Sequence, residues 1–262
     1  MSKRGAATES KSPADGLADS ALGYLGHRGR LRSKFRTLGA SALADYELVE
    51  LALTIAIPRR DTKPAAKALL AAFGSTYGII TADHKDLAAV SGVGETGALL
   101  FKVAYALGKA SLLDKAKGQP VMGNFNSLME YCRVAYGASP IEVVAAIYLD
   151  TAHHIIADEV CQTGTVNRTA VYPRQIAKRA LELNASSVVL CHNHPAGKLE
   201  PSSADIELTV ALAQALLTVE MKLVDHIIVS RTDAISFNNH GFGWCIRAQE
   251  IPPAETRPNR KK

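Results

Sequence analysis

Apolar residues recur at helical spacing through the first half of the chain. Ala44 and Leu48 lie about one helical turn apart, and Gly74 follows a similar apolar stretch. Asp83 is a candidate N-cap residue, and a further short helix is predicted to follow it. Residues 25–113 are therefore predicted to form a small all-helical domain.

The second half alternates short apolar runs with helical patterns. The predicted strands cover residues 143–150, 153–160, 187–191, 223–230 and 234–237. Helical spacing returns after Pro173 and again after Ser203. Strands and helices gathered around one sheet predict an α/β domain over residues 123–246.

Three segments carry neither pattern. Residues 1–24 are rich in Ser, Ala, Gly and charge, and are expected to be a disordered tail. Residues 114–122 combine charge with Gly and Pro, so we place the linker between the domains there. Residues 247–262 are predicted to be a second, basic disordered tail.

Composition limits the class of protein. The chain has 262 residues and is 47% hydrophobic, which supports a sizeable core. An uninterrupted run of roughly 18 apolar residues is lacking, so no membrane span is expected. The N-terminus lacks the apolar stretch of a secretory signal, and the four cysteines form no C-x-x-C pair. Reduced thiols in a cytoplasmic protein are the expectation.

The basic residues gather at the ends of the chain. Residues 1–36 hold eight Lys or Arg against three acidic residues, and residues 247–262 hold five against two. Since the net charge of the chain is +5, the body between them is acidic. Basic tails can contact nucleic-acid phosphates, although solubilising ends are at least as good an interpretation.

A glycine turn joins two predicted helices in the first domain. Gly92 and Gly94 flank Val93, and a long apolar helix follows. Such a turn can bring backbone N–H groups to a phosphate, as in a helix-hairpin-helix that binds DNA. Glu95 follows the turn, in place of the cation that usually accompanies such a site. An ordinary connection between helices is the alternative.

The strongest chemical signal follows the strand over residues 187–191. His192 and His194 are two apart, so they project to the same side of an extended chain. Ser202 can cap the next helix, which puts Asp205 in its first turn. Two imidazoles, one carboxylate and an open position are the ligand set of a catalytic zinc site.

Interpretations without a metal also exist for these residues and their neighbours. A His pair alone is more often a solvated turn than a metal site, and the fixed offsets of Ser202 and Asp205 are what favour the metal. Cys191 would point to the opposite face of its strand, into the core. His226 within a strand is more readily a hydrogen-bonded structural residue than a ligand.

The same residues resemble a known family. The pattern His192-x-His194, Ser202 and Asp205 resembles the JAMM motif of the MPN/JAB metalloproteases. The flanking segments narrow this to a resemblance to the RadC family, whose helix-hairpin-helix portion the first domain also resembles. These segments are Gly164–Asn167, Pro173–Ile176, Asn184-Ala185 and Asp225–Ile228. The resemblance implies an MPN/JAB-like mixed sheet flanked by helices.

The resemblance also implies a reaction. It implies one zinc ion per chain, held by His192, His194 and Asp205 with water in the fourth position. Glu142, just before the first predicted strand, matches the upstream acid/base of the motif, and Ser202 would donate to a developing oxyanion. The expected function is a zinc-dependent metallopeptidase or isopeptidase acting on a peptide or protein.

Other functions remain open at this stage. A DNA-associated repair or mobile-element accessory protein would bind DNA non-specifically through the turn at Gly92 and Gly94 and the basic arm. A zinc deaminase is disfavoured because its H-x-E and P-C-x-x-C signature is absent. The N₂O ligand set would accept other divalent ions. The sequence names neither the substrate nor the oligomeric state.

Overall fold

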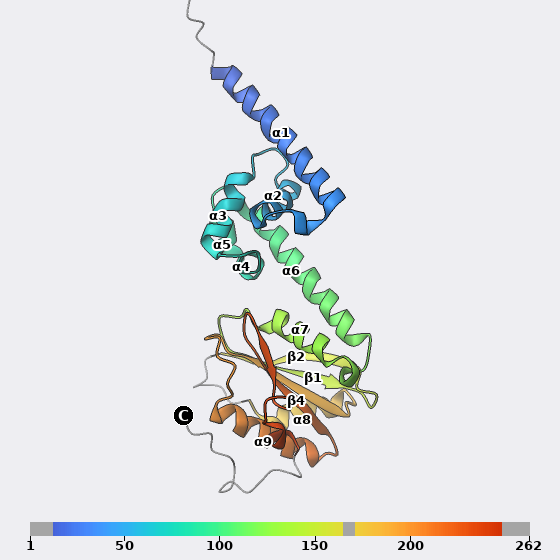
Figure 1. Cartoon of the computed structure of the whole chain (residues 1–262). Helices are drawn as coiled ribbons and strands as arrows, with labels where there is room; N and C mark the ends of the chain where they lie inside the picture. Colours follow the sequence, from blue (N-terminus) through green and yellow to red (C-terminus); the bar gives the residue numbers. More distant parts are fainter. Residues whose placement is uncertain (1–12, 165–170, 248–262) are drawn as a thin grey trace, which may run out of the picture. The chain divides into compact units, whose positions relative to one another are not determined.

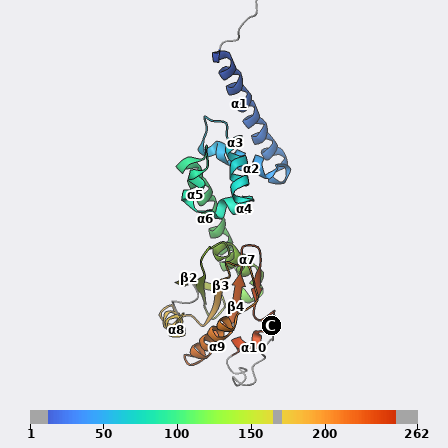
Figure 2. The same cartoon turned by 90° about the vertical axis from the view of Figure 1, so that its left-hand side faces the viewer.

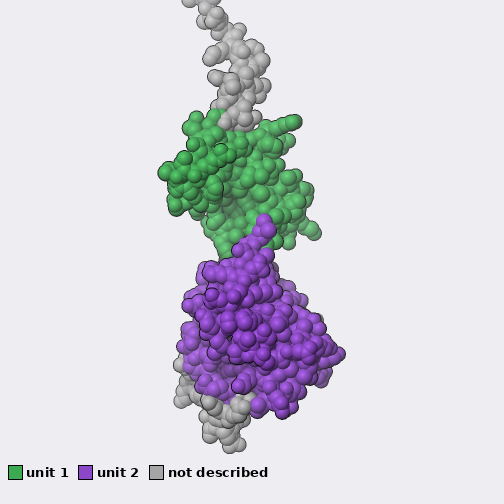
Figure 3. Space-filling model, turned by 90° about the vertical axis from the view of Figure 1, so that its right-hand side faces the viewer, with its two compact units in different colours: residues 1–106 green, residues 107–262 purple. Residues whose placement is uncertain are grey.

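The computed structural model describes residues 13–164 and 171–247. The chain divides into two compact units, residues 1–106 and residues 107–262, coloured separately in Figure 3. We refer to them as unit 1 and unit 2 and describe each by itself.

Unit 1 is helical throughout its described residues, as the sequence predicted (Figure 1). Its α-helices are α1 (Pro13–Leu38), α2 (Asp45–Ala56), α3 (Lys63–Phe73), α4 (Thr76–Thr81), α5 (His84–Ala89) and the start of α6 (Gly94–Lys117). Leu53, Leu69 and Leu87 are fully buried in its core. Gly74 ends α3 at a φ of 77°, a left-handed conformation that favours glycine.

Helix α1 differs from the predicted disordered tail. That tail was drawn over residues 1–24, yet α1 begins at Pro13. Leu17, Ala21 and Leu25 recur every fourth residue, a helical spacing that the charge and glycine content of the segment obscured. Residues 1–12 and 248–262 lie outside the described residues, and with them half of the first predicted tail and nearly all of the second.

Helix α6 runs through the start of the predicted linker, residues 114–122. It continues to Lys117, and Ala116 is buried in the core of unit 2. The charged residues of this segment are tolerated because they lie on a helix surface, so charge alone did not mark a break. Among the described residues, α6 is also long and apolar enough to cross a membrane, by length and composition only. This is weak evidence for a span, because its last turns pack into that core.

The described residues of unit 2 form a five-stranded sheet in the order β2-β1-β3-β4-β5. The strands are β1 (Val143–Leu149), β2 (Ile155–Thr163), β3 (Ser187–Asn193), β4 (Lys222–Val229) and β5 (Ala234–Ser236). Strands β3 and β4 are parallel, and the other neighbours are antiparallel. Every residue of β1 and β3 is buried, which explains their unbroken apolar runs.

Helices cover both faces of this sheet, as Figure 2 shows. Helices α8 (Pro173–Glu182), α9 (Ser203–Leu217) and α10 (Gly243–Ile246) lie against one face. Helix α7 (Phe125–Tyr136) lies against the other, together with the end of α6. The predicted α/β domain with a mixed sheet flanked by helices is confirmed.

Candidate metal centre

Strand pairing brings Glu142 to the two histidines. Val144 of β1 lies opposite His192 of β3 in an antiparallel register. Residues two apart share a face of a sheet. Continuing this register therefore places Glu142 opposite His194, on the face that α9 covers.

Asp205 reaches the site from the first turn of α9. Ser202 is the N-cap, as predicted, and its Oγ accepts from the backbone N–H of Asp205 at 3.2 Å. The Asp205 carboxylate accepts in return from the backbone N–H of Ser202 at 2.7 Å. This reciprocal pair is a capping box, and it fixes the carboxylate at the helix N-terminus. The helix dipole there also favours a negative charge.

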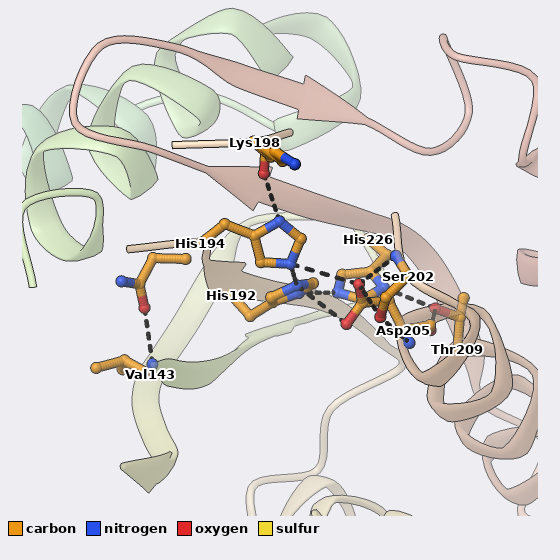
Figure 4. Close-up of polar contacts among 9 residues, drawn as sticks. Val143, His192, His194, Lys198, Ser202, Asp205, Thr209 and His226 are labelled. Atoms are coloured by element: carbon orange, nitrogen blue, oxygen red, sulfur yellow. Dashed lines mark hydrogen bonds and ion pairs between the residues drawn. The ribbon is translucent and has the colours of Figure 1, made fainter. Parts of the chain in front are cut away.

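Four side chains converge at the end of β3. Three of them, His192, His194 and Asp205, are drawn in Figure 4. His192 Nε2 lies 2.8 Å from His194 Nε2 and 3.2 Å from Asp205 Oδ1. His194 Nε2 lies 3.4 Å from Asp205 Oδ2. One ligand atom from each of these residues and one from Glu142 all lie within 4.8 Å of one another. We call these four residues the metal group.

The donor atoms of the metal group fit a divalent ion. Ligand bonds of about 2.0–2.1 Å put neighbouring donors around a tetrahedral ion roughly 3.3 Å apart. The measured separations of 2.8–3.4 Å between the histidines and Asp205 are close to that value. Imidazole and carboxylate ligands suit zinc and other first-row divalent ions. The predicted ligands His192, His194 and Asp205 are thus brought together, and the identity of the metal stays a prediction.

The charges of the group are strongly coupled. Burial raises the pKa of Asp205, but the hydrogen bonds that His192 and His194 donate when they are protonated at Nε2 outweigh it and hold that pKa well below its usual range. The hydrogen bond to Asp205 raises the pKa of His194, against the opposing effect of burial. Asp205 is therefore an ionised carboxylate at neutral pH, ready to act as a ligand.

Two of the predicted roles concern residues beside these ligands. Glu142 lies in the metal group, and its role as acid and base stays a prediction. The Ser202 hydroxyl donates to Asp205 Oδ2 at 2.7 Å, so in this structure it orients the carboxylate. Its predicted role as an oxyanion donor also stays a prediction.

Asn193 is a residue of the site that no sequence pattern predicted. It is fully buried between the two histidines. Its Oδ1 accepts from the backbone N–H of Val143 at 2.7 Å, and its Nδ2 donates to the carbonyls of Ser139 and Ile141, both at 3.2 Å. These bonds hold the segment that carries Glu142. The signal in the sequence was a polar residue at the end of a buried run, but its partners lie some 50 residues away.

His226 lies directly behind His192 and outside the metal group. It is fully buried, and burial lowers its pKa. It is hydrogen-bonded to His192 and to Thr209, which confirms the interpretation of His226 as a hydrogen-bonded residue. Cys191 is likewise buried in the core on the opposite face of β3, as predicted.

A cleft of about 390 Å³ opens beside the metal group. Glu142, His192 and Asp205 line it on one side. Its other walls come from β1, β2, α9, the start of α8 and the residues next to them. Val144, Val171, Pro173, Ala204, Leu208 and Ala211 supply apolar surface, and Gln162, Gly164 and Glu207 complete the lining. The metal group is therefore accessible to a bound molecule from this cleft.

The glycine turn of unit 1 lies between α5 and α6. Gly92 and Gly94 both have positive φ, of 83° and 62°, so the turn depends on glycine at these positions. The turn lines a hollow of about 530 Å³ together with Arg59 and Arg60. Glu95 pairs with His84 at 2.6 Å. The structure thus supplies the cations that the local sequence around the turn lacked.

One comparison with known proteins bears on this chain. Residues 122–242 match the family model of the RadC-like JAB domain. The matched range includes the whole metal group, the cleft residues and His226. It confirms the resemblance that the sequence motif suggested.

Proposed function

Because this chain carries a RadC-like JAB domain, we propose that it is a metal-dependent hydrolase of the metallopeptidase or isopeptidase type, with zinc as its ion. The observation that carries the proposal is the convergence of Glu142, His192, His194 and Asp205 at the edge of a cleft. A purely structural metal site would be closed by four protein ligands and would need no cleft.

His192, His194 and Asp205 would hold the ion. When bound, zinc supplies Lewis-acid chemistry: it lowers the pKa of water to roughly 7 and polarises a carbonyl oxygen. Glu142 accepts a proton as the water oxygen bonds to the substrate carbonyl carbon. It returns that proton to the amine nitrogen as the C–N bond breaks. Asp205 would remain a carboxylate, because the backbone N–H and the hydroxyl of Ser202 both donate to its Oδ2.

The cleft supports a peptide-like substrate. Its apolar walls can bury an aliphatic part of the substrate, while the metal group at one side meets the polar scissile bond. Edge strand β2 contributes Gln162 to the same cleft. An extended chain would therefore reach both the edge of the sheet and the reacting groups.

The test is hydrolysis of a mixture of fluorescence-quenched peptides by the zinc-loaded full chain. Glu142→Gln keeps the shape of the side chain and removes its basicity, so the rate should fall by about 10²–10⁴ with zinc retained. Glu220→Gln removes an exposed carboxylate beyond the far end of α9 and should leave the rate unchanged. Equal rates for wild type and Glu142→Gln would contradict the proposal.

A second function is favoured by the hollow in unit 1. Arg59 and Arg60 line it together with the Gly92–Gly94 turn. Cations beside exposed backbone N–H groups are what a nucleic-acid phosphate requires. We propose that unit 1 binds the DNA backbone without sequence preference.

Salt dependence tests this second proposal. Binding of a DNA duplex should weaken steeply with salt, and the double change Arg59→Gln/Arg60→Gln should reduce the slope of log K against log salt by about 2. Lys222→Gln/Arg231→Gln removes equal charge from exposed positions in unit 2 and serves as the control. Binding that is absent, or equally affected in both double variants, would contradict it.

A further inference from the structure

A buried polar chain runs from the metal group into the core of unit 2 (Figure 4). His192 Nδ1 lies 2.7 Å from His226 Nε2, and His226 Nδ1 lies 2.6 Å from the hydroxyl of Thr209. That hydroxyl donates to the backbone carbonyl of Asp205 at 2.5 Å. His226 and Thr209 are fully buried, and His192 is 1% exposed, so water does not compete with these bonds.

The carbonyl at the end fixes the direction of every bond in the chain. It can only accept, so the single proton of the Thr209 hydroxyl is committed to it. The Thr209 oxygen must then accept from Nδ1–H of His226. A neutral imidazole carries one proton, which leaves Nε2 of His226 as an acceptor. His192 must therefore donate through Nδ1–H, and the lone pair of its Nε2 faces the metal group.

The position of His226 requires the neutral form. Within the described residues, its ring nitrogens are hydrogen-bonded to the Thr209 hydroxyl and the His192 imidazole, and the nearest bonded carboxylate, that of Asp225, accepts from its backbone N–H and not from its ring. An imidazolium buried without a counter-charge is costly, more so beside a divalent ion. The direction of the chain thus follows from burial and the hydrogen-bond geometry together.

His194 reaches the same state by a shorter route. Its Nδ1 lies 2.5 Å from the carbonyl oxygen of Lys198, which can only accept. Nδ1 is therefore protonated, so in the neutral imidazole Nε2 carries the lone pair. Both histidines present Nε2 to the metal group, but His194 is set by a surface loop and His192 by the core.

We propose that Thr209 and His226 are positioning residues that hold His192 in its Nδ1–H tautomer, so that Nε2 is its ligand atom. The proposal rests on the metal-binding role proposed above. Mutation of the outer hydrogen-bond partner of a ligand histidine commonly weakens metal binding strongly. Here the outer partner is a second histidine, whose own tautomer is set by a threonine of α9 that lies one turn after Asp205.

Two substitutions at Thr209 separate this role from packing. Thr209→Val keeps the shape but removes the oxygen, while Thr209→Ser keeps the hydroxyl. Both leave the contact between the rings of His226 and Phe237, whose centroids are 4.5 Å apart. In Thr209→Val, Nδ1 of His226 loses its acceptor. The chain should then reverse, with His226 donating through Nε2 and His192 protonated at Nε2.

The tautomers are read from long-range ¹H–¹⁵N spectra of the metal-free full chain with ¹⁵N-labelled histidine. His192 should be protonated at Nδ1 in wild type and in Thr209→Ser, and should lose that state in Thr209→Val. An Nε2–H tautomer in the wild type would overturn the proposal without any variant. So would an Nδ1–H tautomer that persists in Thr209→Val.

Zinc affinity gives the second readout, by competition with a chromophoric chelator. Thr209→Val should bind zinc about 10–100-fold more weakly than wild type, and Thr209→Ser should bind within a few-fold of it. Equal affinity of all three proteins would overturn the proposal. Neither readout uses a substrate, so a protein that binds zinc through this chain but hydrolyses nothing would refute the proposed function alone.

Discussion

Asn193 shows how a single residue outside the metal group can control it. Its side chain makes three hydrogen bonds to the start of β1 and the segment before it, and the bond from the N–H of Val143 is buried. The position of Glu142 relative to the histidines depends on that segment. A buried polar group that loses its partner costs about 1–3 kcal/mol, so these bonds also stabilise the fold.

We therefore expect two effects from Asn193→Ala. The free energy of unfolding should fall by about 1–3 kcal/mol, because the N–H of Val143 is left unpaired. Hydrolysis should fall with zinc content retained, since Glu142 is misplaced while the ligands remain. Chemical denaturation and metal analysis measure both. Asn238→Ala removes an exposed amide that donates to Val224 and should cost less; an equal cost would contradict this account of Asn193.

Ser202 combines a cap with the support of a ligand. Ser202→Ala removes the acceptor for the N–H of Asp205 and should lower stability by about 0.5–2 kcal/mol. It also removes the hydroxyl bond to the Asp205 carboxylate, so zinc should bind more weakly. Ser202→Thr keeps both bonds and is the matched control in thermal unfolding and zinc titration. Unchanged melting and affinity in Ser202→Ala would show that neither bond matters.

At the residue scale, the sequence predicted those residues of the site whose placement depends on local spacing alone. His192, His194 and Asp205 follow from a strand end, a cap and one helical turn, all within 14 residues of chain. The roles of Asn193 and Thr209, and the partners of His226, did not follow. Their partners come from other strands and helices, and no local pattern reveals which polar groups will meet across a sheet.

At the scale of elements, helix α8 is tied to edge strand β2 by an ion pair. Arg179 Nε donates to Glu159 at 2.9 Å and 3.1 Å, and its Nη2 donates at 2.6 Å. These hydrogen bonds lower the pKa of Glu159, against a smaller opposing effect of burial. The pair lines a second hollow, which shares Gln162 and Val171 with the cleft beside the metal group.

The pH dependence of this pair has a definite sign. A carboxylate whose pKa is lowered on folding adds stability above its unfolded pKa, here the ordinary 4.5, and loses it as the pH falls through the folded value. Arg179→Gln should therefore lower the melting temperature slightly at pH 7. The difference should vanish once Glu159 is protonated. If the difference in melting temperature between wild type and Arg179→Gln persists unchanged at acid pH, the ion pair is not its cause, and packing of the aliphatic part of Arg179 is.

Strands were predicted better than boundaries. The apolar runs of β1, β3 and β4 are long because these strands are covered on both faces, and this pattern is unambiguous. Strand β3 continues to Asn193, beyond the predicted end at Cys191, because two polar residues are buried there. Helix α6 overran the predicted linker for a related reason: burial of Ala116 decides where it ends, and charge does not.

At the scale of the whole molecule, the metal group and the glycine turn belong to different units. Separate cores stabilise the two units, one in unit 1 and one on each face of the sheet in unit 2. Zinc bound to the metal group should therefore stabilise unit 2 directly. Saturation at 1,000 times the dissociation constant corresponds to about 4 kcal/mol.

Hydrogen exchange of the full chain can resolve this difference. Adding zinc should slow exchange across β3 and α9, where the ligands lie, and leave α2 and α3 unchanged. Chelation with EDTA should reverse the effect. Equal slowing in both units would mean that they unfold together, and slowing in unit 1 alone would place the ion elsewhere.

The central claim is that His192, His194 and Asp205 hold a metal ion, and metal content tests it most directly. Wild type and His194→Ala, purified in parallel and supplied with zinc, are compared by elemental mass spectrometry. We predict about one zinc per chain in the wild type and none in the variant. Wild-type protein without metal, or a variant that keeps its zinc, would contradict the claim.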